Sequence, residues 1–192
     1  PRTAGMLERA FARVPREEIY RQTGNQFEPF NTLYQLLAIA EQEPELFAAA
    51  GAVLMLPDLL HYWLSGVKAT EYTVATTTQC YDQRQQAWAI DLLQQLGLPP
   101  RLFQPVLQPG TALGGLRPAL AGQTGCGTRM RVVLPASHDT GSAVTAVPVD
   151  GKDFLYISSG TWSLVGVELE QPFITAASLA CNLTNEGSPQ GR

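Results

Sequence analysis

The stretch RVVLPASHDTGSAVTAV, residues 131–147, decides the fold of this chain. Its apolar start, Arg131 to Leu134, predicts a buried strand, and its small residues from Asp139 to Ala146 predict a helix. The polar residues Ser137-His138-Asp139-Thr140 therefore stand where a strand ends and a helix begins. Such junctions are the usual place of reactive groups in α/β folds, so we predict an α/β protein with a functional carboxylate at Asp139.

A second polar stretch, Ser158-Ser159-Gly160-Thr161, follows about twenty residues later. The residues on either side, 154–158 and 162–169, predict the two strands of an antiparallel hairpin with its turn at Ser159-Gly160. A glycine lets the backbone approach a ligand closely, and backbone amides and a hydroxyl can bind phosphate oxygens. A carboxylate base followed by a phosphate-binding turn indicates phosphoryl transfer.

Both motifs also have a purely structural interpretation. Asp139 could serve only to cap the following helix, and Ser158 to Thr161 could be an ordinary hairpin turn. In the functional interpretation, Asp139 is a general base that removes a proton from a substrate hydroxyl, a role worth about 10²–10⁴-fold in rate. His138 would then contact a substrate hydroxyl rather than a metal, because no second histidine is near in sequence. Thr140 would donate to a sugar oxygen or reinforce the cap.

The composition limits the classes of function open to the chain. Its 192 residues, 45% of them hydrophobic, suffice for one sizeable core or two small ones. The net charge of −4 and the lack of a basic cluster argue against nucleic-acid binding. No apolar run approaches the roughly 20 residues of a membrane span.

The cysteines and histidines point to a reduced, cytoplasmic protein without a metal centre. Cys80, Cys126 and Cys181 are sparse and widely spaced, which is not typical of a disulfide framework. The two histidines, His61 and His138, are far apart in sequence. Since no paired Cys or His spacing is present, we predict no metal-ligating residues.

The first half of the chain predicts mainly helices. We expect them over residues 3–14, 15–23, 44–50 and 83–96, from Asn31 as an N-cap, and from Asp58 as a cap to Gly66. A buried strand is predicted over Val53 to Leu56, residues 71–79 are ambiguous between strand and loop, and residues 99–130 predict mostly loop with short strands. A short helix is expected over Ala176 to Ala180. Turn-forming residues at 147–153 separate the helix-rich part from a strand-rich part and mark the best domain boundary.

A series of short motifs, in order along the chain, carries a family resemblance. They are Gln22–Phe27, Pro29–Leu36, Leu56–Asp58, Glu71–Thr73, Thr76–Gln79, Ser137–Thr140, Ser158–Leu164 and Asn182–Gly187. Together they resemble the FGGY carbohydrate kinases of the actin–hexokinase superfamily, and within that family the rhamnulokinase group. The resemblance extends over essentially the whole chain.

The resemblance implies a ribonuclease-H-like, actin-like ATPase fold of two lobes, of which the chain holds an incomplete part. Residues 1–148 would form the helix-rich rest of the N-terminal lobe, 149–153 the junction, and 154–192 the start of the C-terminal lobe with its first β-hairpin. The implied activity is the ATP-dependent phosphorylation of L-rhamnulose at its 1-hydroxyl, with Mg²⁺, in rhamnose catabolism. The implied location is cytoplasmic, with no nucleic-acid or membrane partner.

Five residues receive roles from the resemblance. Asp139 matches the proton acceptor of the family, and His138 and Thr140 match its substrate-contacting neighbours. Gly160 and Thr161 match contacts to the nucleotide phosphates.

Four positions depart from the family pattern. Asn25 and Glu28 stand where apolar residues are expected. Val74 stands where the family usually has Asn, which puts any polar role there in doubt. Gly141 replaces a common Ala and should loosen the helix after Asp139 by up to about 1 kcal/mol.

The resemblance also implies that parts of the site lie outside the chain. The family's N-terminal phosphate loop would precede Pro1 and its adenosine-binding region would follow Arg192, so we expect a segment of a longer protein that is inactive alone. Two alternatives remain open. One is an FGGY kinase for another ketose, such as fuculose or xylulose, and the other is an inactive sugar-binding or structural module. The oligomeric state is not predicted.

Overall fold

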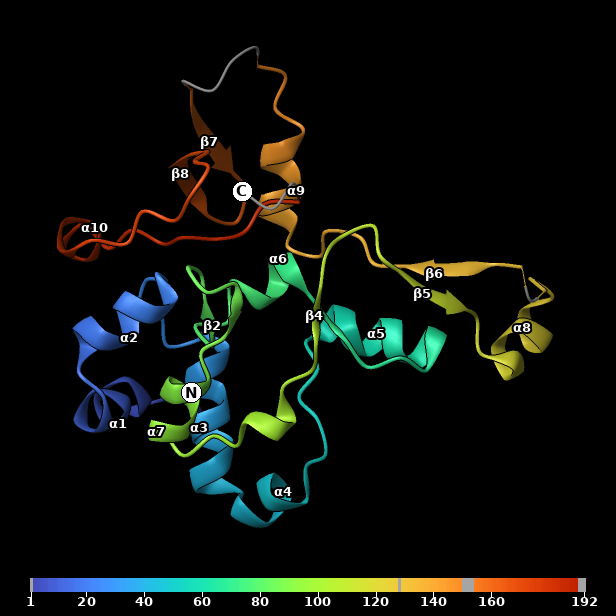
Figure 1. Cartoon of the computed structure of the whole chain (residues 1–192), viewed down its shortest axis with the longest axis horizontal. Coiled ribbons are helices and arrows are strands. Elements are labelled where there is room, and N and C mark those ends of the chain that lie inside the picture. Colours follow the sequence, from blue (N-terminus) through green and yellow to red (C-terminus); the bar gives the residue numbers. More distant parts are fainter. Residues whose placement is uncertain (1, 128, 150–153, 190–192) are drawn as a thin grey trace. The chain divides into compact units, whose positions relative to one another are not determined.

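The computed structural model of the protein describes residues 2–127, 129–149 and 154–189, and Figure 1 traces its elements along the chain. The chain forms two compact units, each made of three segments. Unit 1 comprises residues 1–53, 75–104 and 171–186, and unit 2 comprises residues 54–74, 105–170 and 187–192. The described helices include no candidate for a bilayer span, because none joins sufficient length to sufficient hydropathy.

Unit 1 is mainly helical, with one short antiparallel sheet formed by β2 and β3. Its elements are α1 (Met6–Arg13), α2 (Arg16–Thr23), α3 (Thr32–Gln42), α4 (Pro44–Ala49), β2 (Tyr81–Asp82), β3 (Ala87–Trp88), α7 (Ile90–Gln95), the 3₁₀ turn η1 (Pro100–Leu102) and α10 (Ala176–Ala180). Helices α1, α3 and α7 contribute to one hydrophobic core. Its fully buried side chains include Met6, Leu33, Tyr34, Leu37, Leu92, Leu93 and Leu96. Helical spacing of apolar residues thus builds this unit, as the sequence predicts.

Unit 2 carries both motifs on which the functional prediction depends. Its elements are α5 (Leu56–Ser65), β1 (Thr70–Glu71), the start of α6 (Tyr72–Ala75), β4 (Val106–Leu107), β5 (Ala112–Gly115), α8 (Pro118–Thr124), β6 (Arg131–Val133), α9 (Asp139–Thr145), β7 (Leu155–Ser159) and β8 (Ser163–Val167). Strand β1 pairs in parallel with β4, β5 pairs antiparallel with β6, and β7 pairs antiparallel with β8. Helix α9 packs against β7.

The helices predicted near the start of the chain are confirmed as α1 to α4, each within a few residues of its expected bounds. Asn31 occupies the predicted N-cap position of α3, but its side chain does not cap the helix. Its amide Nδ2 instead donates to the Gln26 carbonyl and to Gln79 Oε1, each at 3.0 Å. The strand over 131–133, the helix from Asp139 and the helix over Ala176–Ala180 are also confirmed.

The predicted strand over residues 53–56 is wrong. Leu56 is the first residue of α5, and Met55 is its N-cap. Asp58 lies in the first turn of α5 rather than at the cap, and its side chain accepts a hydrogen bond from the Glu71 backbone. A short apolar run here leads into a helix, which periodicity alone cannot distinguish from a buried strand.

The predicted helix over residues 83–96 is wrong in its first half. Ala87 and Trp88 form β3, and the helix begins only at Ile90. Gln86 has a φ of 52°, a left-handed backbone conformation that an α-helix does not allow. Between residues 99 and 130, which predict mostly loop, the chain also forms the helix α8.

The predicted hairpin is confirmed, but its turn lies one residue further along the chain. Ser159 pairs with Ser163, so the loop consists of Gly160, Thr161 and Trp162 rather than Ser159-Gly160. The predicted lobe junction at 149–153 falls almost entirely on residues 150–153, which lie outside the described part of the chain. The lobe boundaries therefore stay a prediction.

Candidate active site

Asp139 is the first residue of α9, directly after the segment that follows β6. Its side chain is fully exposed, at 100% of its accessible surface. Its Oδ1 accepts a hydrogen bond of 2.8 Å from the Thr140 backbone amide, so it contributes in part to the helix start. The N-cap position belongs to His138, whose side chain makes no capping bond. The carboxylate therefore stays open to an incoming ligand.

His138 and Thr140 stand on either side of this carboxylate, as the sequence predicts. His138 Nε2 lies 3.9 Å from Asp139 Oδ1, which is an ion-pair distance when the imidazole is protonated. The His138 side chain is about one-fifth exposed, so it borders the same open space. The structure thus brings the three residues 138–140 together at the start of α9.

A buried carboxylate, that of Glu71, accepts hydrogen bonds that fix the segment 137–140. Glu71, the last residue of β1, is 0% exposed. Its Oε2 accepts hydrogen bonds from the Ser137 backbone amide at 3.0 Å and from Thr73 Oγ1 at 2.5 Å. Thr73 Oγ1 in turn accepts a hydrogen bond of 3.1 Å from the His138 backbone amide. Two consecutive amides before Asp139 are therefore fixed by one buried pair of side chains.

The same carboxylate also fixes the start of α6. Glu71 Oε1 accepts from the Thr73 backbone amide at 2.8 Å, and Oε2 accepts from the Val74 amide at 3.3 Å. A carboxylate at a helix start is favourable because the first amides of a helix have no partner within it. Position 74, where the family resemblance expects Asn, thus contributes its backbone amide to the network.

Asp58 supports Glu71 from α5. Its Oδ1 accepts a hydrogen bond of 3.0 Å from the Glu71 backbone amide, and the side chain is only 1% exposed. Burial raises the pKa of Asp58 to about 6, and the Glu71 charge adds to this, while backbone amides of Glu71 and Met55 oppose it. The second oxygen, Oδ2, has no hydrogen-bond partner among the described residues.

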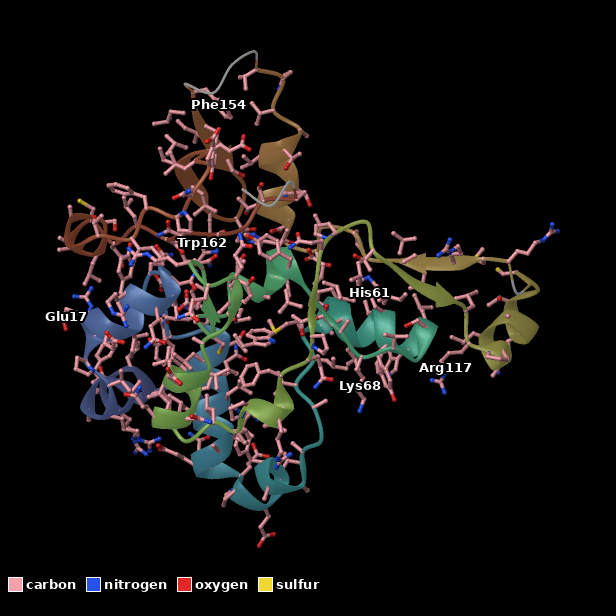
Figure 2. The ribbon with its side chains drawn as sticks, viewed as in Figure 1. Glu17, His61, Lys68, Arg117, Phe154 and Trp162 are labelled. Carbon is pink, nitrogen blue, oxygen red and sulfur yellow. The ribbon has the colours of Figure 1, made fainter. Side chains whose placement is uncertain are left out.

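His61 lies one turn further along α5 and is labelled in Figure 2. Burial lowers the pKa of His61, and the negative charge of Glu71 opposes that effect. Asp58, His61 and Glu71 thus form a small group of ionisable side chains beneath the segment 137–140.

Further contacts close the loop between β6 and α9. Ser142 Oγ donates a hydrogen bond of 2.8 Å to the Ala136 carbonyl, which ties the first turn of α9 to the preceding loop. A Cβ atom placed on Gly141 would lie 3.4 Å from the Gly187 carbonyl oxygen. The helix start is therefore packed from a second segment of unit 2 as well.

The hairpin loop, residues 160–162, is more exposed than the segment 137–140. The Gly160 amide donates to the Trp162 carbonyl at 2.7 Å, and Ser159 Oγ lies 3.4 Å from Ser163 Oγ. Gly160 and Thr161 are exposed, and a Cβ atom placed on Gly160 would have no other atom within 4 Å. The backbone of this loop is thus accessible to a ligand.

The two motifs lie toward the same end of the hairpin. Because α9 packs against β7, the helix and the hairpin run beside each other. Figure 2 shows Phe154 at one end of the hairpin and Trp162 at the other, and Figure 1 shows that α9 begins near the second of these ends.

Sequence reasoning missed the two supporting residues, Glu71 and Thr73. Both belong to a motif that carries the family resemblance, but the sequence leaves residues 71–79 ambiguous between strand and loop and assigns neither residue a role. The available signal was a carboxylate two residues before a threonine, at the end of a short strand. Only the fold shows that these side chains reach residues 66 and 65 positions further along the chain.

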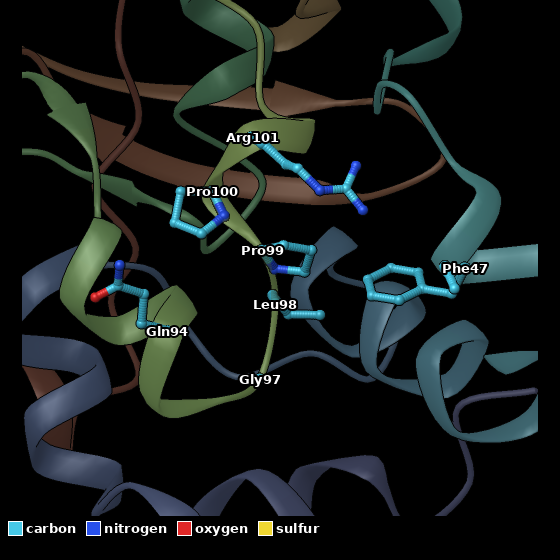
Figure 3. Close-up of a pocket in the computed structure, with 8 residues that line it drawn as sticks. Phe47, Gln94, Gly97, Leu98, Pro99, Pro100 and Arg101 are labelled. Carbon is cyan, nitrogen blue, oxygen red and sulfur yellow. The ribbon is translucent and has the colours of Figure 1, made fainter. Parts of the chain in front are cut away.

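The pocket in Figure 3 lies in unit 1 and is separate from these motifs. Its volume is about 410 Å³, and its lining includes Phe47, Leu98, Pro99 and Arg101. The Arg101 guanidinium donates to the Ala50 carbonyl at 2.9 Å, so this charge is already engaged. None of the residues predicted to bind substrate or phosphate lines the pocket.

Residues 1–146 match the sequence model of the FGGY family of carbohydrate kinases, N-terminal domain. The chain belongs to the FGGY family of carbohydrate kinases. A ligand-bound xylulose kinase from Lactobacillus acidophilus has a similar fold, with a TM-score of 0.81 at 21% identity over 92% of this chain and 36% of that one.

Two curated relatives are similar along the whole chain. The rhamnulokinase of Oceanobacillus iheyensis is 47% identical over 192 residues, which cover 100% of this chain and 40% of that protein. The rhamnulokinase of Klebsiella pneumoniae is 45% identical over 191 residues, which cover 100% of this chain and 38% of that protein. The chain thus spans about two-fifths of the length of the relatives it matches.

Proposed function

We propose that the protein phosphorylates the ketose L-rhamnulose at its 1-hydroxyl, with ATP as donor, to give L-rhamnulose 1-phosphate in rhamnose catabolism. The observation that carries the proposal is the exposed carboxylate of Asp139 at the start of α9, in a chain of the FGGY family. The choice of ketose is supported by the relatives of 45–47% identity, which are named rhamnulokinase. Use of ATP supports a cytoplasmic location.

In the proposed reaction, Asp139 acts as the general base. It accepts the proton of the ketose 1-hydroxyl while that oxygen forms a bond to the γ-phosphorus and the bond to the bridging oxygen of ADP breaks. His138 and Thr140 hold neighbouring hydroxyls of the sugar. Because phosphoryl transfer depends mainly on positioning and charge, the base has to be correctly placed rather than strongly basic.

The hairpin loop would hold the phosphates of the nucleotide. The Gly160 backbone leaves open space for an oxygen to approach, and the exposed Thr161 hydroxyl can donate a hydrogen bond. Hydrogen bonds of this kind would stabilise the negative charge on the phosphate oxygens during transfer.

The described residues do not by themselves form an enclosed metal site, so the Mg²⁺ that the family resemblance implies stays a prediction. Magnesium is normally bound by one or two carboxylates together with nucleotide phosphates and water. Within the described ranges, no group of three acidic, histidine or cysteine side chains could enclose a metal ion. We therefore derive no step of the reaction through a metal ion.

The test compares the complete protein that contains this sequence with its Asp139→Asn variant. ATP consumption is measured with L-rhamnulose, xylulose and fuculose as separate substrates. We expect L-rhamnulose to be preferred and the variant to lose about 10²–10⁴-fold in kcat, because it lacks the proton acceptor. Turnover of the variant near the wild-type rate would contradict the role of Asp139, and preference for another ketose would contradict the substrate.

A further inference from the structure

We propose that Glu71 and Thr73 are positioning residues for the reaction, and that they place Asp139 by holding the backbone amides of Ser137 and His138. This inference rests on the proposed role of Asp139 as general base. Neither residue touches the substrate in this account, because both are fully buried at the end of β1 and the start of α6.

The contacts reach the two residues directly before Asp139. Glu71 Oε2 receives the Ser137 amide at 3.0 Å, and Thr73 Oγ1 receives the His138 amide at 3.1 Å. These two bonds fix the direction in which the chain enters α9. Since Asp139 is the next residue and its own side chain is exposed, the backbone is the part of this segment that the network fixes.

The network requires a carboxylate at position 71. Within the described part of the chain, the Glu71 side chain accepts hydrogen bonds from four donors, namely the Thr73 amide, the Thr73 hydroxyl, the Val74 amide and the Ser137 amide. A glutamine has nearly the same shape as the glutamate, but an NH₂ group replaces one of the two carboxylate oxygens, and this group would face a hydrogen-bond donor. A buried donor that loses its acceptor is costly, so Glu71→Gln should shift the segment 137–138 away from its present place.

Thr73 links the two parts of the network. Its hydroxyl donates to Glu71 Oε2 and accepts from the His138 amide, so one oxygen uses both its donor and an acceptor site. Valine at this position keeps the shape but removes both bonds. Serine keeps both bonds and loses only a methyl group, which makes Thr73→Ser the matched rescue variant.

Displacement of the reacting groups by about 1 Å can cost about 10²-fold in rate. We therefore expect Thr73→Val and Glu71→Gln to lower kcat by about 30–100-fold while KM for ATP stays within about threefold. Thr73→Ser should keep kcat within about fivefold of the wild type.

The experiment measures kcat and KM in the complete protein for the wild type, Asp139→Asn, Glu71→Gln, Thr73→Val and Thr73→Ser. Thr23→Val is the control for a general loss of stability, because the Thr23 hydroxyl is equally buried and donates to the Ile19 carbonyl at 2.9 Å, in unit 1. This control should lower the melting temperature without lowering kcat. If Thr73→Val does not fold, Thr73→Ala against Thr73→Ser makes the same comparison.

The outcomes separate this inference from the proposed function. If the wild type is active and Asp139→Asn is not, but Glu71→Gln and Thr73→Val keep kcat within threefold, the positioning role is overturned and the base assignment stands. Equal losses for Thr73→Ser and Thr73→Val would also overturn it. If the wild type lacks kinase activity, or Asp139→Asn retains it, the proposed function itself fails.

Discussion

The segment 137–140 and the hairpin loop 160–162 both belong to unit 2, but they are held in different ways. The first is anchored by buried side chains, since Glu71 and Thr73 receive the amides of Ser137 and His138. The second is an exposed three-residue loop in which the Gly160 amide donates to the Trp162 carbonyl, next to the pair of hydroxyls Ser159 and Ser163. The contrast fits the proposed kinase reaction, in which the base would be placed before the substrate arrives, while a phosphate-binding loop would complete its contacts on the nucleotide itself.

The largest expected difference between the two regions is in catalysis. Thr161→Ala should reduce kcat/KM by only about tenfold, because one hydrogen bond to a charged group contributes about 1.5–3 kcal/mol at most and water can replace part of it. Asp139→Asn should reduce kcat, and with it kcat/KM, by about 10²–10⁴-fold. Both are measured on the complete protein with ATP and L-rhamnulose. A larger loss for Thr161→Ala than for Asp139→Asn would reverse the comparison.

The next effect concerns the free energy of unfolding, which depends on pH through the buried carboxyl group of Asp58. The pKa of Asp58 is raised by burial to about 6, so the folded state binds its proton more tightly than the unfolded state does. This favourable contribution is complete below the ordinary pKa of about 4 and is lost as pH rises through about 6. Asp58→Asn should therefore be more stable than the wild type at pH 8 by about 1–3 kcal/mol, with the difference shrinking toward pH 4.

Thermal midpoints of the wild type and Asp58→Asn, measured across pH 4–8, test whether the variant gains stability relative to the wild type as pH rises. Asp91→Asn is a suitable control, because Asp91 lies exposed in the first turn of α7. A wild-type protein that gains stability relative to Asp58→Asn as pH rises would contradict the buried position of Asp58.

The smallest effect compares a glycine from each region. A Cβ atom on Gly141 would make ordinary contacts, 3.4 Å from the Gly187 carbonyl and 3.6 Å from His138 Nδ1. Gly141→Ala should therefore raise the free energy of unfolding by about 0.5–1 kcal/mol through helix propensity. Gly160→Ala should change it by less than about 0.5 kcal/mol, since the position is open. Denaturant unfolding measures both, and destabilisation by Gly141→Ala would show that the start of α9 is packed more tightly than described.

The sequence predicted those features that depend on neighbouring residues. The start of α9 at Asp139 follows from a strand, a polar segment and a run of small residues, and the hairpin follows from two apolar runs around a glycine. The predicted strand at Val53–Leu56 failed because a short apolar run looks the same before a helix. The predicted helix at residues 83–96 failed because Gln86 adopts a left-handed conformation that no pattern of apolar residues reveals.

The support of the site could not be predicted in the same way. The hydrogen bond between Glu71 and Ser137 joins residues 66 positions apart, and its existence depends on β1 being placed beneath the loop that precedes α9. The sequence does not distinguish a buried Asp or Glu side chain from an exposed one. The burial of Glu71, Thr73 and Asp58 and their hydrogen bonds follow from the fold and not from the sequence pattern.

Amide hydrogen exchange of the complete protein tests the central claim most directly. In the part of the chain that the structure describes, the Ser137 and His138 amides donate to buried acceptors, whereas the Thr161 amide donates to no acceptor. We predict that the Ser137 and His138 amides exchange at least about 10²-fold more slowly than the Thr161 amide, and that Thr73→Val removes the protection of His138. Rapid exchange of Ser137 and His138 in the wild type, at the rate of Thr161, would contradict the claim that Glu71 and Thr73 hold Asp139 in place.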